Sequence, residues 1–325
     1  MPLTDLSLAE LETYRSPAIE PRDFDEFWTR TLAEQSVHAG APARFEPIDS
    51  PLRTVEVQDV TFAGFGGTPV RGWFLRPRNV EGPLPCVVEL PGYGGGRGLP
   101  HESLLYSAAG YAHLVMDVRG QGAHWLAGDT PDPQSVGAPR YPGFMTDGIA
   151  DPDDYYFRRL IVDAVHAVQV AAVHPSVDPD RVCVMGGSAG AFLALATTAL
   201  GARVRGVICD VPFLCDVRRG CDIATDGPYL EVAGLLRTRR DLVSRAFATL
   251  GYFDGVSFAR RATAPALFSA ALMDPICPPS TVFAAVHEYA GPVEMTTWPF
   301  NRHEGGEGYQ QLRRLAFLDQ QLAAS

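Results

Sequence analysis

The segment of the sequence best suited to chemistry is Gly186-Gly187-Ser188-Ala189-Gly190. It matches the pattern G-x-S-x-G, and it lies between an apolar strand-like segment, 181–185, and an apolar helix-like segment, 189–200. A strand-to-helix turn this tight strains the serine backbone and leaves room only for small flanking residues, here Gly186 and Gly190. It also points the amide of Ala189 at a developing oxyanion. The pattern predicts that Ser188 is a nucleophile; the alternative is a glycine-rich turn without chemistry.

A serine hydroxyl needs a general base, and the base needs a carboxylate to orient it. In the fold that this motif belongs to, they follow in the order serine, acid, histidine. Of the eight histidines, only His303 follows the last predicted strand, so we predict that it is the base. Asp274 follows the predicted strand 265–270 and is the favoured acid. Asp210, after the strand 204–209, is its rival, although we expect it to anchor its own loop through backbone hydrogen bonds.

A glycine-rich segment follows the predicted strand 86–90 and has the sequence Pro91-Gly92-Tyr93-Gly94-Gly95-Gly96-Arg97-Gly98. Its glycines would let backbone amides turn toward a substrate oxygen, which predicts the second oxyanion donor here. Glycine-rich turns also bind phosphates. The sequence contains no G-x-x-x-x-G-K-[ST] motif, so we favour the oxyanion over the phosphate interpretation.

From residue 85 onward, predicted strands alternate with predicted helices. The strands are 86–90, 112–116, 181–185, 204–209, 265–270 and 293–298, and the helices are 155–173, 189–200, 281–289 and 309–322. This alternation predicts an α/β fold with a mostly parallel central sheet and helices on both faces.

The sequence predicts further elements around this core. Residues 1–50 are expected to be a helical extension, in which Asp23 and Glu26 form a capping box. Residues 54–63 and 70–75 predict a β-hairpin. The long connection 120–154 predicts a functional or interface loop. The segment 212–262 predicts a helical insertion near the site.

The composition narrows the classes of partner. The chain has 325 residues, 46% of them apolar, and a net charge of −11, which argues against nucleic acid and anionic membranes. The first residues lack the pattern of a secretory signal, so we expect a cytoplasmic protein. The longest apolar stretch, 264–273, is too short to span a bilayer. We expect the six cysteines to be reduced structural thiols, with Cys277 the candidate for a reactive one.

With these residues in place, the chain resembles the acetyl xylan esterase / cephalosporin C deacetylase family, carbohydrate esterase family seven. The resemblance runs over nearly the whole chain. It rests on Gly92-Tyr93, Arg119-Gly120-Gln121, the segment around Ser188, His303-Glu304, and the longer segments 141–145, 209–215 and 274–280. Together these segments are more specific than any one motif.

The resemblance implies one α/β-hydrolase domain over 1–325 and a triad of Ser188, His303 and Asp274. It implies an oxyanion hole from the amides of Tyr93 and Ala189, and support of the site by Arg119, Gln121, Gly186, Gly190 and Glu304. It also implies deacetylation of small acetylated sugars and cephalosporin C type esters, and a hexamer with contacts from 120–154. A mechanism of this kind needs no cofactor or metal.

One position departs from the family. Its motif usually has the form G-x-S-Q-G-G, whereas this chain has Ala189 in place of the glutamine. The backbone amide is preserved, but we expect the missing side chain to enlarge or dry the pocket. Alternatives within the fold are a natural-product deacetylase, a lactonase or a peptidase. A catalytically silent scaffold is the alternative outside enzymes, and the intact serine, histidine and acid argue against it.

Overall fold

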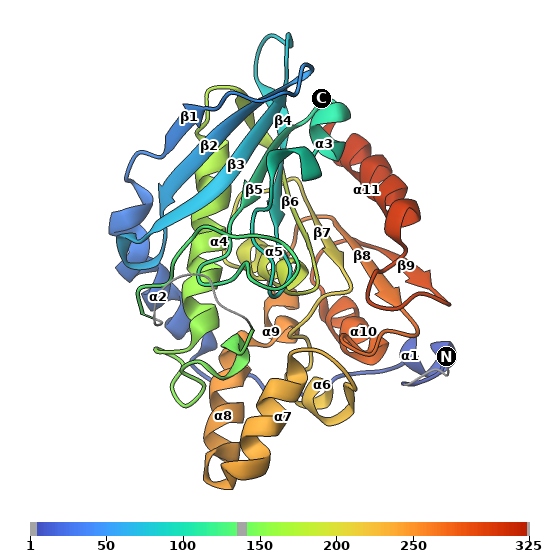
Figure 1. Ribbon diagram of the computed structural model, residues 1–325. Coiled ribbons are helices and arrows are strands. Elements are labelled where there is room, and N and C mark those ends of the chain that lie inside the picture. The colour runs from blue at the N-terminus through green and yellow to red at the C-terminus, as the bar shows by residue number, and fades with distance from the viewer. Residues whose placement is uncertain (1–4, 135–141, 324–325) are drawn as a thin grey trace.

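The computed structural model describes residues 5–134 and 142–323 and is built around one nine-stranded sheet (Figure 1). Its order is β1-β2-β3-β5-β4-β6-β7-β8-β9. The strands are β1 (Arg44–Pro47), β2 (Val55–Ala63), β3 (Pro69–Pro77), β4 (Leu84–Leu90), β5 (Ala112–Met116), β6 (Val177–Gly187), β7 (Gly206–Asp210), β8 (Ala266–Ala271) and β9 (Val293–Trp298). β1, β2, β3 and β5 pair antiparallel, and the pairs from β5 through β4 to β9 are parallel. The predicted mostly parallel sheet is therefore confirmed.

Helices cover both faces of this sheet. The main helices are α2 (Phe24–Ala39), α4 (Tyr156–Ala172), α5 (Ala189–Ala199), α10 (Pro279–Glu288) and α11 (Glu307–Leu322). Along β4, Val88 packs in the large core with α4 and α5, whereas Val87 packs with Phe317 of α11. This alternation is the period of two that a strand buried on both faces must have.

The first fifty residues differ from the prediction. They hold a short helix, α1 (Leu8–Leu11), then α2, and also the edge strand β1. The predicted capping box of α2 is wrong, because Asp23 makes no side-chain hydrogen bond to the helix. Its carboxylate instead accepts a hydrogen bond from the hydroxyl of Tyr252, at 2.7 Å, so a long-range contact replaces the local one.

The two long connections lie at the end of the sheet where the parallel strands finish (Figure 1). The described part of 120–154 contains a 3-10 turn, η3 (Phe144–Thr146), while 135–141 fall outside the described residues. The insertion 212–262 holds α6 (Val217–Ile223), α7 (Tyr229–Thr238), α8 (Val243–Leu250) and α9 (Gly255–Ala259). Of these, α7 and α8 project at the bottom of Figure 1, beyond the carboxyl ends of β7 and β8. A helical insertion is thus present where the sequence predicted it.

One buried histidine lies in the antiparallel half of the core. The ring of His174 packs against Phe45 and Phe74, with centroids 4.5 and 4.1 Å away. Its Nδ1 accepts the amide of Ser176 at 3.1 Å, and its Nε2 lies 3.2 Å from the side-chain oxygen of Gln58. Burial lowers the pKa of His174 to about 4, so this imidazole is neutral at pH 7.

All six cysteines are free thiols. Among the described residues, the structure contains no helix with the length and apolar character needed to cross a lipid bilayer.

Candidate active site

Ser188 occupies the sharp turn between β6 and α5. Its backbone has φ 57° and ψ −119°, a conformation that costs free energy in a non-glycine residue. A Cβ at Gly186 would overlap the backbone of Gly190, and a Cβ at Gly190 would overlap the carbonyl of Leu90. Gly187, by contrast, has open space around that position. The turn therefore requires glycine at 186 and 190 because there is no space for a Cβ atom, and not because these positions need a flexible backbone.

The loop after β7 holds this strained turn in place. The amide of Ser188 donates to the carbonyl of Asp210 at 2.8 Å, and the amide of Phe213 donates to the carbonyl of Ser188 at 3.0 Å. The loop is itself strained, because Val211 is β-branched and has φ 40°. Hydrogen bonds of both the amide and the carbonyl of Ser188 thus hold its backbone, and with it the place from which its side chain projects.

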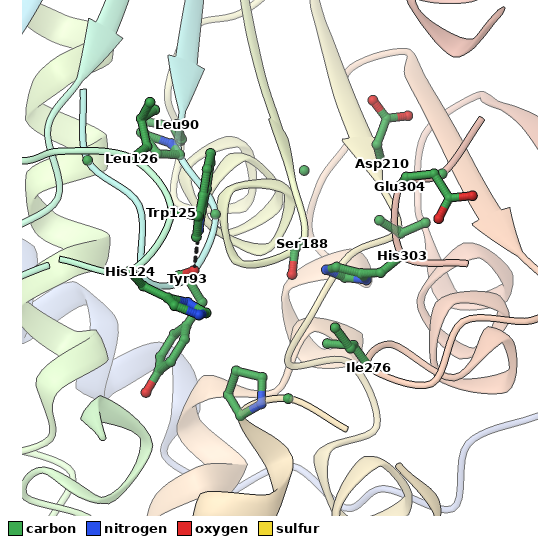
Figure 2. Close-up of a pocket in the computed structure, with 18 of the residues that line it drawn as sticks. Leu90, Tyr93, His124, Trp125, Leu126, Ser188, Asp210, Ile276, His303 and Glu304 are labelled. Carbon is green, nitrogen blue, oxygen red and sulfur yellow. Dashed lines mark hydrogen bonds between the residues drawn. The ribbon is translucent and has the colours of Figure 1, made fainter. Parts of the chain in front are cut away.

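His303 and Asp274 lie beside this hydroxyl. His303 Nδ1 and Asp274 Oδ2 are 2.8 Å apart, and Asp274 is fully buried. The other carboxylate oxygen of Asp274 accepts the amides of Ile276 and Cys277, at 2.8 and 3.0 Å. Figure 2 shows the hydroxyl of Ser188 facing the imidazole of His303. The structure brings the side chains predicted as nucleophile, base and acid together, in the order serine, histidine, aspartate.

Asp210, the rival acid, is occupied elsewhere. Its carboxylate accepts hydrogen bonds from Ser269 at 2.8 Å, and from Gln310 and Arg314 of α11 at 2.5 Å each. The prediction that it anchors its loop through backbone groups is wrong for the carboxylate, because these partners are side chains. This carboxylate fixes α11 to the sheet and has no described contact with His303.

Cys277 lies next to the serine. Its Sγ is 3.9 Å from Ser188 Oγ, and burial raises the pKa of the thiol well above its usual range. A neutral buried thiol is a weak nucleophile. Asp274, Cys277 and His303 also bring three potential metal-ligand atoms within 4.8 Å of one another. In the structure, these side chains contact one another and Ser188, through the pairs His303–Asp274 and Cys277–Ser188.

Three glycine amides of the loop after β4 bond to a neighbouring segment. The amide of Gly94 donates to the side chain of Gln121, and those of Gly96 and Gly98 donate to the carbonyls of Leu126 and Ala127. These amides turn toward the segment 121–128 and away from a substrate. The glycines allow close packing instead, because Cβ atoms at these positions would overlap that segment.

Tyr93, in the same loop, carries the amide that was predicted as the second oxyanion donor. Within the described residues, the backbone amides of Tyr93 and Ala189 have no hydrogen-bond acceptor. The carbonyl of Tyr93 accepts Nε1 of Trp125 at 2.8 Å, which fixes the loop beside Ser188 (Figure 2). The side chain of Ala189 is buried in the core and does not line the cavity, so the structure does not support the expected widening of the pocket at this position.

Arg119 and Gln121 lie beneath this loop. Arg119 is buried and pairs with the carboxylate of Asp163 at 2.5 Å. Gln121 accepts the amide of Gly94 and donates to the hydroxyl of Tyr156 at 2.9 Å. Neither lines the cavity, whereas Glu304 does, and its carboxylate accepts the amide of Arg302 at 3.1 Å. That all of them support the site stays a prediction.

A cavity of about 1110 Å³ opens above Ser188. The insertion contributes Pro228, Leu230 and Glu231, and Ile276 lies near His303 (Figure 2). His124 and Trp125 line the opposite wall. Sequence reasoning missed these two residues, and the only signal was the unusual length of the connection 120–154.

Trp125 presents one face of its ring to this cavity. It is 56% exposed. A Cβ on Gly95 would lie 2.7 Å from Cε2 and 3.0 Å from Cη2, and closer still to Cζ2 between them, so Gly95 packs against the face of the ring and not its edge. Figure 2 shows the ring edge-on, with its other face toward Ser188. A flat apolar surface therefore lies opposite the nucleophile.

Comparisons with known proteins show which family this chain is similar to. The acetyl xylan esterase (AXE1) family model matches residues 1–321. The structure of an acetyl xylan esterase from Paenibacillus sp. R4 is 35% identical, with a TM-score of 0.89, and the match covers 98% of this chain and 100% of that one. Acetyl xylan esterase 1 from Thermoanaerobacterium sp. JW/SL YS485 is 31% identical, with a TM-score of 0.87 and the same coverage.

A curated relative is more distant. Acetyl esterase Axe7A of Xylanibacter ruminicola is 28% identical over 296 residues, which are 87% of this chain. The chain spans 63% of the length of that relative. The family match, the two solved structures and the arrangement around Ser188 lead to one conclusion: this chain belongs to the acetyl xylan esterase family, a family of carboxylic ester hydrolases.

Proposed function

We propose that this protein is a serine esterase that removes acetyl groups from small substrates through an acyl-enzyme. The substrates are acetylated xylo-oligosaccharides and other sugars, together with acetate esters of the cephalosporin C type. The observation that carries the proposal is the hydrogen bond between His303 and Asp274, 2.8 Å long, beside the hydroxyl of Ser188. Family membership supports the acetyl group as the acyl part.

In the first half of the reaction, Ser188 Oγ attacks the carbonyl carbon of the acetyl group while Nε2 of His303 takes the hydroxyl proton. The carbonyl oxygen becomes an oxyanion and accepts the amides of Tyr93 and Ala189. Asp274 keeps the proton of His303 on Nδ1 and stabilises the imidazolium. The C–O bond to the alcohol then breaks, and the alcohol leaves with the proton from His303.

The second half repeats these steps with water. His303 takes a proton from a water molecule, whose oxygen attacks the acetyl carbon of the acyl-enzyme. The oxyanion is bound by the same amides. When it collapses, Ser188 Oγ leaves and regains its proton from His303, and acetic acid is released.

The exposed face of Trp125 supports a sugar as the alcohol. One side of a pyranose ring presents C–H groups, which pack well against the negatively charged face of an aromatic ring. Trp125 lies opposite Ser188 and is held by Tyr93, so a sugar stacked there would have its acetylated oxygen near the nucleophile. We further propose a homo-oligomer, a hexamer by family resemblance, which sedimentation velocity can test.

The test of the proposed function compares wild type with Ser188→Ala on 4-nitrophenyl acetate. We expect turnover to fall by several orders of magnitude, with an unchanged fold by circular dichroism, because the triad acts as a unit. A serine-directed phosphonylating reagent should inactivate wild type in a one-to-one ratio. A mutant that keeps a tenth of the activity contradicts the assignment, and a wild type without turnover or labelling indicates a silent scaffold.

The substrate class needs a rate series. Acetylated xylo-oligosaccharides, cephalosporin C, longer acyl esters and a peptide substrate are compared by kcat/KM at one pH. We expect the sugar acetates to lead the series. A preference for the peptide, or for longer acyl esters, contradicts the acetyl sugar assignment while leaving the serine mechanism in place.

A further inference from the structure

The side chain of Tyr93 joins the oxyanion loop to two other segments. Its hydroxyl lies 2.7 and 2.9 Å from the carboxylate oxygens of Glu231, on α7 of the insertion, and donates its proton to that carboxylate. The same phenol oxygen accepts the amide of Phe144, in η3, at 2.7 Å. Burial raises the pKa of Tyr93 above its usual range, so the phenol stays a donor at every working pH.

Glu231 contacts the oxyanion loop and η3 at once. Its carboxylate accepts the amide of Met145 at 3.1 Å in addition to the hydroxyl of Tyr93. In Figure 2 the phenol of Tyr93 points away from Ser188, which places this contact behind the loop rather than at the reacting atoms. Glu231 therefore acts on the loop through the phenol.

The other end of Tyr93 is also held. Its carbonyl accepts Nε1 of Trp125 at 2.8 Å, and the next amide, that of Gly94, donates to Gln121. Because the phenol and the carbonyl of Tyr93 are both held, the tetrahedral geometry at its Cα leaves one place for its amide nitrogen. The position of the Tyr93 amide is thus coupled to the phenol ring, and the ring to Glu231.

We propose that Glu231 is a positioning residue for ester hydrolysis: by holding the phenol of Tyr93, it keeps the Tyr93 amide aimed at the developing oxyanion. This inference rests on the proposed function, because it assigns a task within that oxyanion hole. It makes the helical insertion part of the catalytic apparatus as well as a wall of the cavity.

A double-mutant cycle tests the proposal. Removing an oxyanion donor costs about 10²–10³-fold in kcat, and a misdirected donor should lose part of that. We expect Glu231→Ala and Tyr93→Phe each to lower kcat for 4-nitrophenyl acetate by about 10- to 100-fold, with KM changed by less than about threefold. The double variant should lose no more than the larger single loss, because both changes remove the same hydrogen bond between Tyr93 and Glu231. Glu231→Gln, whose amide oxygen can still accept the phenol proton, should recover most of the activity.

A transition-state analogue gives a readout that a purely structural role would not move. 1,1,1-Trifluoroacetone forms a hemiketal oxyanion with an active serine, so its inhibition constant should rise in parallel with the loss of kcat. Arg237→Ala, an exposed change on the same helix, is the control and should alter neither quantity. Thermal melting of each variant separates misfolding from misdirection.

Losses that multiply in the double variant overturn the proposal, as does inhibition by trifluoroacetone that stays constant across the series. If Glu231→Ala fails to fold, Tyr93→Phe decides alone, and a kcat within about twofold of wild type refutes the inference. These outcomes are distinct from failure of the proposed function. That failure would appear in the comparison of wild type with Ser188→Ala, as turnover that the substitution does not abolish.

Discussion

Replacing Asp274 by asparagine perturbs one hydrogen bond at the site while keeping the shape of the side chain. In the structure, Asp274 Oδ1 accepts the amides of Ile276 and Cys277, and Oδ2 faces Nδ1 of His303. An asparagine has one oxygen and one NH₂ group. The two loop amides therefore select the orientation in which the oxygen faces them, and the NH₂ group must face His303.

The consequence is a change of tautomer. An NH₂ group facing Nδ1 of His303 needs an acceptor there, so the ring proton moves to Nε2, the atom that should take the proton of Ser188. The opposite orientation of the amide would leave the two loop amides without an acceptor, at about 1–3 kcal/mol each, which makes it a minor state. Loss of the base and of its charge partner should lower kcat by roughly 10⁴-fold, as in other triads.

The matched control is Asp210→Asn, at the end of β7. This change leaves His303 untouched but removes the charge facing the half-buried Arg314, 2.5 Å away. We expect a loss of stability of about 3–5 kcal/mol and a kcat within about tenfold of wild type. Initial rates with 4-nitrophenyl acetate measure kcat, and urea denaturation measures stability. A large loss of kcat for Asp210→Asn together with a small one for Asp274→Asn would refute the reasoning.

Three more outcomes follow from single positions. The pKa of His174 is about 4 in the folded protein, whereas a histidine in the unfolded chain has a pKa of ~6.5, so the unfolded chain binds more protons between these two pH values. Acidification from pH 7 to 5 should therefore lower the free energy of unfolding by about 2 kcal/mol, as measured by urea denaturation, and His174→Asn should remove most of that loss. Gly190→Ala should prevent folding or cost several kcal/mol by clashing with Leu90, whereas Gly187→Ala should stay within about 1 kcal/mol, as compared by thermal melting. Acetyl esters should exceed butyryl esters at least about tenfold in kcat/KM, and Ala189→Gln should change that ratio by less than about threefold, because residue 189 does not line the cavity; a larger change would show that it does set acyl size.

Most of the parallel half of the fold was predictable because central strands such as β5 and β7 are buried on both faces. Strands β5 and β9 have the bounds that the apolar runs 112–116 and 293–298 indicate. The carboxyl ends of parallel strands meet at one edge, so residues that follow them, such as Ser188 and Asp274, come together whatever the loops do between them. Chain order then selected His303 without any knowledge of the contacts.

Residues held by long-range contacts were not predictable in the same way. Asp23 has the local pattern of a capping residue, but its partner Tyr252 lies far along the chain. The glycines after β4 have the pattern of an anion-binding turn, but the amides of Gly94, Gly96 and Gly98 donate to the segment 121–128. In both cases a local pattern is consistent with two structures, and the choice depends on a segment distant in sequence.

The position of Ala189 shows where differences within the family should be sought. The substitution stands out in the sequence because it lies inside the motif, yet its side chain is buried and does not line the cavity. The cavity wall is built instead by Trp125 and by the insertion residues Leu230 and Glu231. These residues lie outside any strand or motif, so the tight geometry that the turn around Ser188 imposes on its residues does not apply to them. We therefore expect substrate range to vary with the segments 120–134 and 212–262, while the reaction stays with the turn around Ser188.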